Sequence, residues 1–325
     1  MKNFKIAQPI DFKQAAHLLA LKKPGFYPIA GGTDLLDEIK NHIISPEAVV
    51  DLTSIPNMSF IQQEKNSIRI GALTPVNDLI ESKLIETNYS VLHQAALSLA
   101  TPQLRNVGTI GGNLCQRPRC WYYRDPQILC WKKGGEDCFA YSGKNKYHAI
   151  FGGEFCFIVH PSDLAPALIC LDAEVVIVTA DKEKKVKLAD FYHLPQENKR
   201  GETILEPGEL LKEIIVPLSK NGEKSIYLKI KERSTWDFAV VSAAVKGKFS
   251  GKRINDIRIV LGGVAPVPWR LEKAEKYLKG KNADENSIRA AARGGLKDAA
   301  SLEENAYKKD LVEAVLVDTI IALSE

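Results

Sequence analysis

Short apolar runs alternate with helical patterns along the first third of the chain. Three runs are short, apolar and bounded by turn residues, which predicts buried strands. They are PIAGG (28–32), AVVDL (48–52) and SIRIGAL (67–73). Helical spacing occurs at 34–40, 75–84 and 88–99, with Thr74 and Asn88 as expected N-caps. The alternation predicts a fold that mixes helices and strands.

Periodicity is lost between residues 117 and 153. This segment is rich in glycine, proline, charged and aromatic residues and is too long for an ordinary loop. Apolar patterns then return. We expect a strand at FCFIVH (155–160), a helix LAPALICL opened by Ser162 and Asp163, and strands at 174–180, 202–217 and 225–233.

The last hundred residues form a second unit. Two predicted strands are joined by a turn at 250–252, and helical patterns follow at 270–278, 284–299 and 303–324. A polar linker, SKNGEK (219–224), precedes them. We therefore expect an α+β protein with one domain at 1–220 and a second at 221–325.

Composition narrows the functional class. The chain has 325 residues, 45% of them hydrophobic and 26% charged, which suits a globular protein of two domains. A net charge of +4 without a lysine- and arginine-rich run speaks against nucleic-acid binding. We expect no membrane span, and the N-terminus resembles no signal peptide. A cytoplasmic location is expected, with export alongside a folded partner as the alternative.

Two glycine pairs occupy positions where apolar runs give way to helical patterns. They are PIAGGTDLL (28–36) and GTIGGN (108–113). Glycine lets a backbone approach a ligand closely, and the N–H groups of a helix start bind anions such as pyrophosphate. Neither pair matches the dinucleotide fingerprint or the phosphate loop of nucleotide-binding proteins. The alternative is that each pair is only a tight turn.

Five of the six cysteines lie within residues 115–156. Four of them, Cys120, Cys130, Cys138 and Cys156, lie among arginines, lysines and aromatic rings. Their wide spacing differs from the short knuckles of zinc sites, whereas iron–sulfur clusters tolerate varied spacing. Spacing alone leaves an iron–sulfur cluster, a zinc site and unliganded thiols open.

The other two cysteines and His148 are not expected to be metal ligands. Cys170 lies in an apolar helix and is expected to pack in the core. Cys115, directly after the second glycine pair, is also taken as a packing residue. His148 is expected to be a solvated loop histidine, with cluster ligation as its alternative.

Five motifs, taken in their order along the chain, resemble those of a known protein family. They are PIAGGTDLL, TIGGNL, HPSDLAPAL, LKIKERSTWDFAVVSAAV and LGGVAPVPWR. Over essentially its whole length the chain resembles the FAD-binding medium subunit of the molybdenum hydroxylase (xanthine dehydrogenase) family. The resemblance implies a two-part FAD-binding domain of the vanillyl-alcohol-oxidase type, with subdomains at about 1–56 and 57–220. A small C-terminal α+β domain, a three-stranded sheet with helices, would follow.

The same resemblance implies the flavin contacts. FAD would be non-covalent, because PIAGGTDLL holds no histidine or cysteine. Two groups would hold the pyrophosphate from opposite sides: Ala30, Gly31, Gly32, Thr33 and Asp34, and Thr109, Gly111, Gly112 and Asn113. Ser162 and Asp163 would lie near the ribityl and ribose groups, Leu211 near the flavin ring and Lys229 beside the isoalloxazine. No catalytic residue is implied, since electrons would pass through cofactors.

The segment 117–156 resembles an insertion in two subgroups of this family. These are the periplasmic-type aldehyde oxidoreductases and 4-hydroxybenzoyl-CoA reductase, whose flavin subunit carries a [4Fe-4S] cluster. The resemblance assigns such a cluster to Cys120, Cys130, Cys138 and Cys156, with zinc as a minor alternative.

The implied function is an electron-transfer subunit of a heterotrimeric molybdenum hydroxylase, foremost an aldehyde oxidoreductase. Its partners would be a molybdenum-cofactor large subunit, a small subunit with two [2Fe-2S] clusters, and an external acceptor or donor protein. One alternative is a reductase that runs electrons inward from ferredoxin. The others are a self-standing flavin oxidase and a zinc-stapled binding module without redox function.

Overall fold

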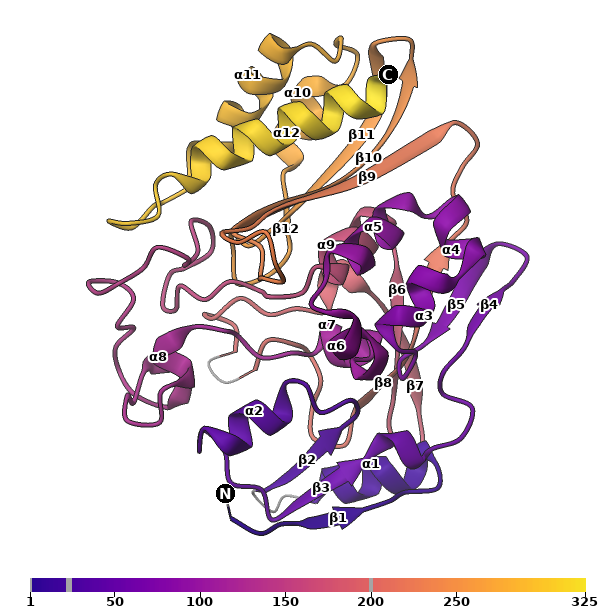
Figure 1. Cartoon of the computed structure of the whole chain (residues 1–325), viewed down its shortest axis with the longest axis vertical. Helices are drawn as coiled ribbons and strands as arrows, with labels where there is room; N and C mark the ends of the chain where they lie inside the picture. Colours follow the sequence, from indigo (N-terminus) through magenta and orange to yellow (C-terminus); the bar gives the residue numbers. More distant parts are fainter. Residues whose placement is uncertain (1, 22–24, 199–200) are drawn as a thin grey trace.

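The structure is a computed structural model that describes residues 2–21, 25–198 and 201–325. Three sheets organise it (Figure 1). The first sheet is parallel, in the order β1-β3-β2. Its elements in chain order are β1 (Lys5–Ala7), α1 (Phe12–Ala20), β2 (Phe26–Ile29), α2 (Leu35–Lys40) and β3 (Ala48–Asp51). Parallel neighbours need crossover connections, which α1 and α2 provide.

The second sheet is antiparallel, with the order β4-β5-β8-β6-β7. Its strands are β4 (Ile61–Gln63), β5 (Ser67–Gly71), β6 (Glu174–Val178), β7 (Glu183–Lys187) and β8 (Leu210–Pro217). Its accompanying helices are α3 (Val76–Glu81), α4 (Lys83–Asn88), α5 (Ser90–Ser98), α6 (Pro102–Val107), α7 (Ile110–Leu114) and α9 (Leu164–Cys170). Every residue of α9 is buried, so its small apolar side chains lie inside the main core.

The third sheet, with the order β12-β11-β10-β9, belongs to the C-terminal third. Its strands are β9 (Glu223–Ile230), β10 (Val241–Ser250), β11 (Arg253–Gly262) and β12 (Trp269–Arg270). Its helices are α10 (Glu272–Leu278), α11 (Glu285–Gly295) and α12 (Lys308–Ser324). The helices α10 and α12 contact this sheet, and α5 and α9 of the preceding part contact it too (Figure 1). The two-residue strand β12 is an addition to the expected three strands, and it pairs with the end of β11.

The cysteine loop, residues 117–156, is described throughout. Its regular elements are one turn of helix, α8 (Trp121–Arg124), and a 3-10 turn (Trp131–Lys133). It runs along one side of the molecule between α2 and the segment before α12 (Figure 1). The long non-periodic segment is therefore an ordered structure, held by side-chain contacts and by single backbone hydrogen bonds such as Ile150 N–H to Val264 O at 2.8 Å.

Several predicted elements differ from the observed ones. The described residues 155–160 form no strand, because their backbone bonds occur singly, such as His160 N–H to Ala265 O at 2.9 Å. The predicted strand 202–217 begins only at Leu210, since Pro207 and Gly208 turn the chain before it.

The predicted helix 75–84 is also wrong in its boundaries. It is divided between α3 and α4 at Ser82, whose hydroxyl caps α4. Asn88 ends α4 instead of capping α5, and the hydroxyl of Thr74 donates to Phe60 O. In the part of the chain that the structure describes, no helix has the length and apolar character needed to cross a bilayer.

Candidate functional site

The two glycine segments lie against each other, backbone to backbone. A Cβ atom added at Gly31 would lie 1.8 Å from Val107 O, so a side chain cannot be accommodated there. The second segment packs on Ala72, because Gly111 N–H donates to Ala72 O at 2.8 Å. Gly32 has φ +72°, which glycine adopts without strain. Glycine thus permits a close approach that other residues would prevent.

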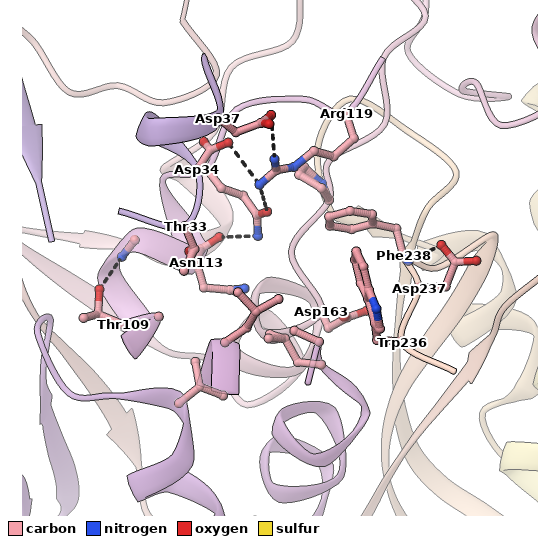
Figure 2. A pocket seen from close by; sticks show the side chains of 18 residues that line it. Thr33, Asp34, Asp37, Thr109, Asn113, Arg119, Asp163, Trp236, Asp237 and Phe238 are labelled. Atoms are coloured by element: carbon pink, nitrogen blue, oxygen red, sulfur yellow. Dashed lines mark hydrogen bonds and ion pairs between the residues drawn. The ribbon is translucent and has the colours of Figure 1, made fainter. Parts of the chain in front are cut away.

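Two cavities meet at these glycine segments. The first cavity, of about 300 Å³, lies between the segments and the C-terminal domain (Figure 2). The second cavity, of about 290 Å³, has an apolar wall that includes Tyr27, Leu52 and Leu210. Both cavities share the residues Thr33, Asp34, Thr109, Gly112 and Gln116. An elongated ligand can therefore extend from one cavity into the other past the glycine pairs.

The residues expected to bind a cofactor gather around these cavities. Those that line the second cavity are Ala30, Gly31, Gly32, Thr33, Asp34, Thr109, Gly111, Gly112 and Leu211. Asn113 and Asp163 line the first cavity. Two further residues support that wall: Ser162 Oγ donates to Asn113 Oδ1 at 2.6 Å, and Lys229 Nζ lies 2.7 Å from Asp163 Oδ2. Leu211 and Asp163 therefore line different cavities.

A buried charged cluster forms the floor of the first cavity at Asp163. Lys229 donates to one carboxylate oxygen, and Tyr227 OH donates to the other at 2.7 Å. Burial and the adjacent carboxylate raise the pKa of Tyr227 well above its usual value. Tyr227 was not predicted. Its position two residues before Lys229 on β9, hence on the same face, was the available signal.

A second group that the sequence analysis missed comes from the loop between β9 and β10. Trp236, Asp237 and Phe238 line the first cavity from the side of the C-terminal domain (Figure 2). The guanidinium of Arg119 lies 5.3 Å from the centre of the Phe238 ring. The cysteine loop and the C-terminal domain therefore contact each other at this cavity.

The four expected ligand cysteines converge on one small pocket. Cys120, Cys130, Cys138 and Cys156 line it, and its other walls are Tyr122, Tyr123, Trp131, Lys132, Phe139, His148 and Ile158. Burial raises the pKa of Cys120 to about 12. The expectation that His148 is solvated is wrong: its side chain is buried in the wall of this pocket, and its Nε2 lies 3.2 Å from Cys120 Sγ. The Cys156 thiol donates to Cys138, which lowers the pKa of Cys138.

The other two cysteines lie apart from this pocket, as the sequence analysis expected. Cys115 lines the second cavity, and Cys170 is buried in the core. Within the described residues, no group of three or more His, Cys, Asp or Glu side chains closes around a single metal ion. Zinc requires its donors at about 2.3 Å from one point. The thiols thus share a pocket without forming a single-ion site.

Comparisons with known proteins cover the whole chain. The family profile for the FAD binding domain in molybdopterin dehydrogenase matches residues 2–219. The profile for the CO dehydrogenase flavoprotein C-terminal domain matches residues 226–323. Aldehyde oxidoreductase FAD-binding subunit PaoB of Escherichia coli (strain K12) is 37% identical over 309 residues, covering 94% of this chain and 93% of that protein.

Other relatives agree with these matches. Carbon monoxide dehydrogenase medium chain of Hydrogenophaga pseudoflava is 30% identical over 290 residues, covering 89% of this chain and 84% of that one. Reconstituted CO dehydrogenase from Oligotropha carboxidovorans superimposes with a TM-score of 0.78 at 25% identity, covering 99% of this chain and 98% of that one. The mixed α+β fold with an FAD-binding and a C-terminal domain is thereby confirmed. The chain belongs to the FAD-binding subunits of the molybdenum hydroxylase family, and it is part of an oxidoreductase complex.

Proposed function

We propose that this chain is the electron-transferring subunit of an aldehyde oxidoreductase and that it carries a [4Fe-4S] cluster beside its FAD. The identity of 37% to an aldehyde oxidoreductase subunit over nearly the whole chain supports the first part. The observation that carries the second is the convergence of Cys120, Cys130, Cys138 and Cys156 on one pocket. Its partners would be a molybdenum-cofactor large subunit, a small subunit with two [2Fe-2S] clusters, and an external acceptor or donor protein.

FAD fits the two joined cavities as an elongated molecule. Its pyrophosphate would lie at the shared residues, where Gly112 leaves room and Thr109 Oγ1 accepts the Gly112 N–H. The isoalloxazine would occupy the first cavity beside Asp163, and the adenosine would occupy the second. Leu211 would then contact the adenosine end and not the ring, since it lines the second cavity.

Buried polar side chains of this protein surround the place proposed for the isoalloxazine in the first cavity. FAD, when bound, can take up and release electrons singly or in pairs. Lys229 is almost completely buried, and its ammonium balances the Asp163 carboxylate at 2.7 Å. Tyr227 donates to the same carboxylate, so Asp163 is oriented by two donors. Trp236 and Phe238 line this cavity on the side of the C-terminal domain.

The side chains around the cysteine pocket also suit an iron–sulfur cluster, because they include a buried lysine and aromatic rings. An iron–sulfur cluster transfers single electrons, and its potential depends on net charge and solvent exposure. Lys132 lines the pocket and is buried, and its Nζ lies 2.8 Å from Glu202 Oε1. Aromatic rings such as Tyr123 and Trp131 separate the thiols from water.

The test is a cofactor assay on protein purified without oxygen. Iron, inorganic sulfide, zinc and FAD are measured per chain, together with a visible spectrum. About four irons and four sulfides with one FAD are expected for a [4Fe-4S] flavoprotein. Zinc in place of iron would contradict the cluster, and protein that binds no added FAD would contradict the flavin assignment. Aldehyde-dependent reduction of the complex reconstituted with its partner subunits then tests the substrate class.

A further inference from the structure

Asp34 lies in the first glycine segment, yet both of its carboxylate oxygens are bonded by the cysteine loop. Oδ2 accepts the backbone N–H of Arg117 at 2.7 Å, and Oδ1 accepts Nη2 of Arg124 at 2.6 Å. Nη2 of Arg119 lies 3.0 Å from the same Oδ1 (Figure 2). A residue expected to contact FAD is thus held by the insertion.

The helix α2 continues this connection. Nη1 of Arg124 donates to Asp37 Oδ2 at 3.0 Å, and Tyr123 OH donates to Glu38 Oε1 at 2.6 Å. Burial raises the pKa of both Glu38 and Tyr123. Glu38 lines the second cavity, whereas Tyr123 lines the cysteine pocket. One hydrogen bond therefore joins the walls of the two sites.

These contacts have an electrostatic consequence for FAD. Asp34 lines both cavities at the point where they meet, which is where a pyrophosphate would lie. An unpaired carboxylate there would repel the anion, because like charges at short range repel each other strongly in a partly buried site. The backbone N–H of Arg117 donates to that carboxylate, and the guanidinium groups of Arg124 and Arg119 offset its charge. Closure of the cysteine loop on α2 thus makes the site more favourable for an anion.

We propose that Asp34 and Arg124 are positioning residues that couple FAD binding to closure of the cysteine loop on α2. FAD then binds more tightly when the loop is closed. By thermodynamic linkage, FAD also holds the loop closed and slows the release of whatever its thiols bind. The proposal requires FAD in the two cavities, and it does not depend on which metal the thiols hold.

The test begins with Arg124→Gln. Arg124 is absent from the described residues that line the two cavities, so an effect on FAD must pass through its partners. We expect the Kd for FAD, measured by quenching of flavin fluorescence, to rise at least about fivefold, the lower end of typical coupling between sites. The matched control is Arg270→Gln, which removes a two-pronged pair with Glu275 in the C-terminal domain and should leave the Kd unchanged.

A double-mutant cycle shows whether Arg124 acts by offsetting the charge of Asp34 or only by keeping the cysteine loop in place. With Asp34→Asn as the background, Arg124→Gln should raise the Kd less than about twofold. The carboxylate at the junction of the two cavities is then gone, and the only remaining ion-pair partner of Arg124 among the described residues is Asp37, which lines the first cavity alone. A full fivefold effect in that background, or no effect in the wild-type background, would overturn the proposal. The conservative Arg124→Lys should lie between wild type and Arg124→Gln, since it keeps the charge but loses the second hydrogen bond.

The reciprocal measurement distinguishes coupling from general instability. Saturating FAD should slow loss of iron to a chelator in the wild type and should lose this effect in Arg124→Gln. A merely unstable variant would lose iron faster by the same factor with and without FAD. Suppose that the wild type holds iron but Arg124→Gln leaves the Kd for FAD unchanged. The proposed coupling is then wrong, and the proposed cluster is supported. If instead the wild type holds no iron but Arg124→Gln weakens FAD binding, the proposed cluster is wrong and the proposed coupling is supported.

Discussion

The proposed flavin site and the cysteine loop are built in opposite ways. The proposed flavin site is formed by glycine segments where strands and helices meet, and their backbones touch directly, as at Gly31 and Val107. The cysteine loop has almost no regular structure and is held by side chains such as Arg124 and Tyr123. The first site should therefore be sensitive to an added atom, and the second to a deleted one.

The far side of the cysteine loop shows the same dependence on single side chains. Asn305 Nδ2 donates to the carbonyls of His148 and Ala149, and Lys308 Nζ donates to those of Tyr147 and Gly263. The loop is therefore held between α2 on one side and the start of α12 on the other. Both attachments are made by residues far away in the sequence.

The largest effect is expected from deleting one thiol. Cys138→Ala should remove essentially all of the about four irons of a [4Fe-4S] cluster, because the pocket then has three thiols. FAD supplied in excess should still bind at about one per chain, since Cys138 lies outside the two cavities' described lining. Iron and flavin analysis measure both. Cys170→Ala, in the core, is the control, and unchanged iron in Cys138→Ala would contradict the ligand set.

The next effect comes from an added side chain at Gly112. A Cβ there meets only Thr109 Oγ1, at 3.1 Å, so the fold accepts it once that hydroxyl shifts by a few tenths of an ångström. The longer side chain of Gly112→Leu would enter both cavities and should weaken FAD binding at least about 100-fold by obstructing the pyrophosphate. The melting temperature without FAD should stay close to that of wild type. Gly294→Leu, where an added Cβ meets open space, should leave FAD affinity intact.

Gly31→Ala should break the same site in a different manner. Its Cβ would overlap the Val107 carbonyl at 1.8 Å, so the two glycine segments must separate. We expect a loss of about 3 kcal/mol in the free energy of unfolding, as for overpacked interiors, together with weaker FAD binding. Chemical denaturation without FAD measures the first quantity. A stable Gly31→Ala protein with normal FAD affinity would disprove the close approach.

The smallest effect concerns Lys308, which is buried beneath the cysteine loop. Burial lowers its pKa to about 7, whereas an unfolded lysine titrates near 10.4. Between these values the unfolded chain binds the extra proton, so stability should rise with pH, by at most about 1.4 kcal/mol per unit. Below about pH 7 the contribution should be constant.

Replacing Lys308 by Met should remove this pH dependence. The quantity to measure is the difference in unfolding free energy between wild type and Lys308→Met at pH 7 and pH 9. That difference should shift in favour of wild type as the pH rises. Lys309→Met is the control, and an equal difference at both pH values would show that Lys308 keeps its ordinary pKa in the folded protein.

Many helices and strands could be predicted from the sequence, because the spacing of apolar residues reflects which side of each element is buried. The helix at Leu164–Cys170 and the strands at Val241–Ser250 and Arg253–Gly262 follow that pattern. The run 155–160 was misread, because apolar side chains can also pack from an irregular backbone. Glycine pairs marked the cavities, since close backbone approach requires them.

The side-chain connections were beyond the reach of the sequence. Arg124 and Asp34 are 90 positions apart, and an ion pair leaves no periodic pattern in either segment. Tyr227 lies in the predicted strand 225–233 and Trp236 in the motif LKIKERSTWDFAVVSAAV. Neither pattern shows that Tyr227 donates to Asp163 or that Trp236 lines the first cavity. Their roles depend on which helices and strands pack together, and this packing involves residues along the whole chain.

The sheet of the C-terminal domain lies between its own helices and the helices α5 and α9. Tyr227, Ala244 and Val260 of that sheet belong to the same hydrophobic core as α9. A chain cut between the two family-profile regions would therefore expose apolar surface on both pieces. In evolutionary terms, a substitution on either side of this junction must therefore suit the packing of the other side.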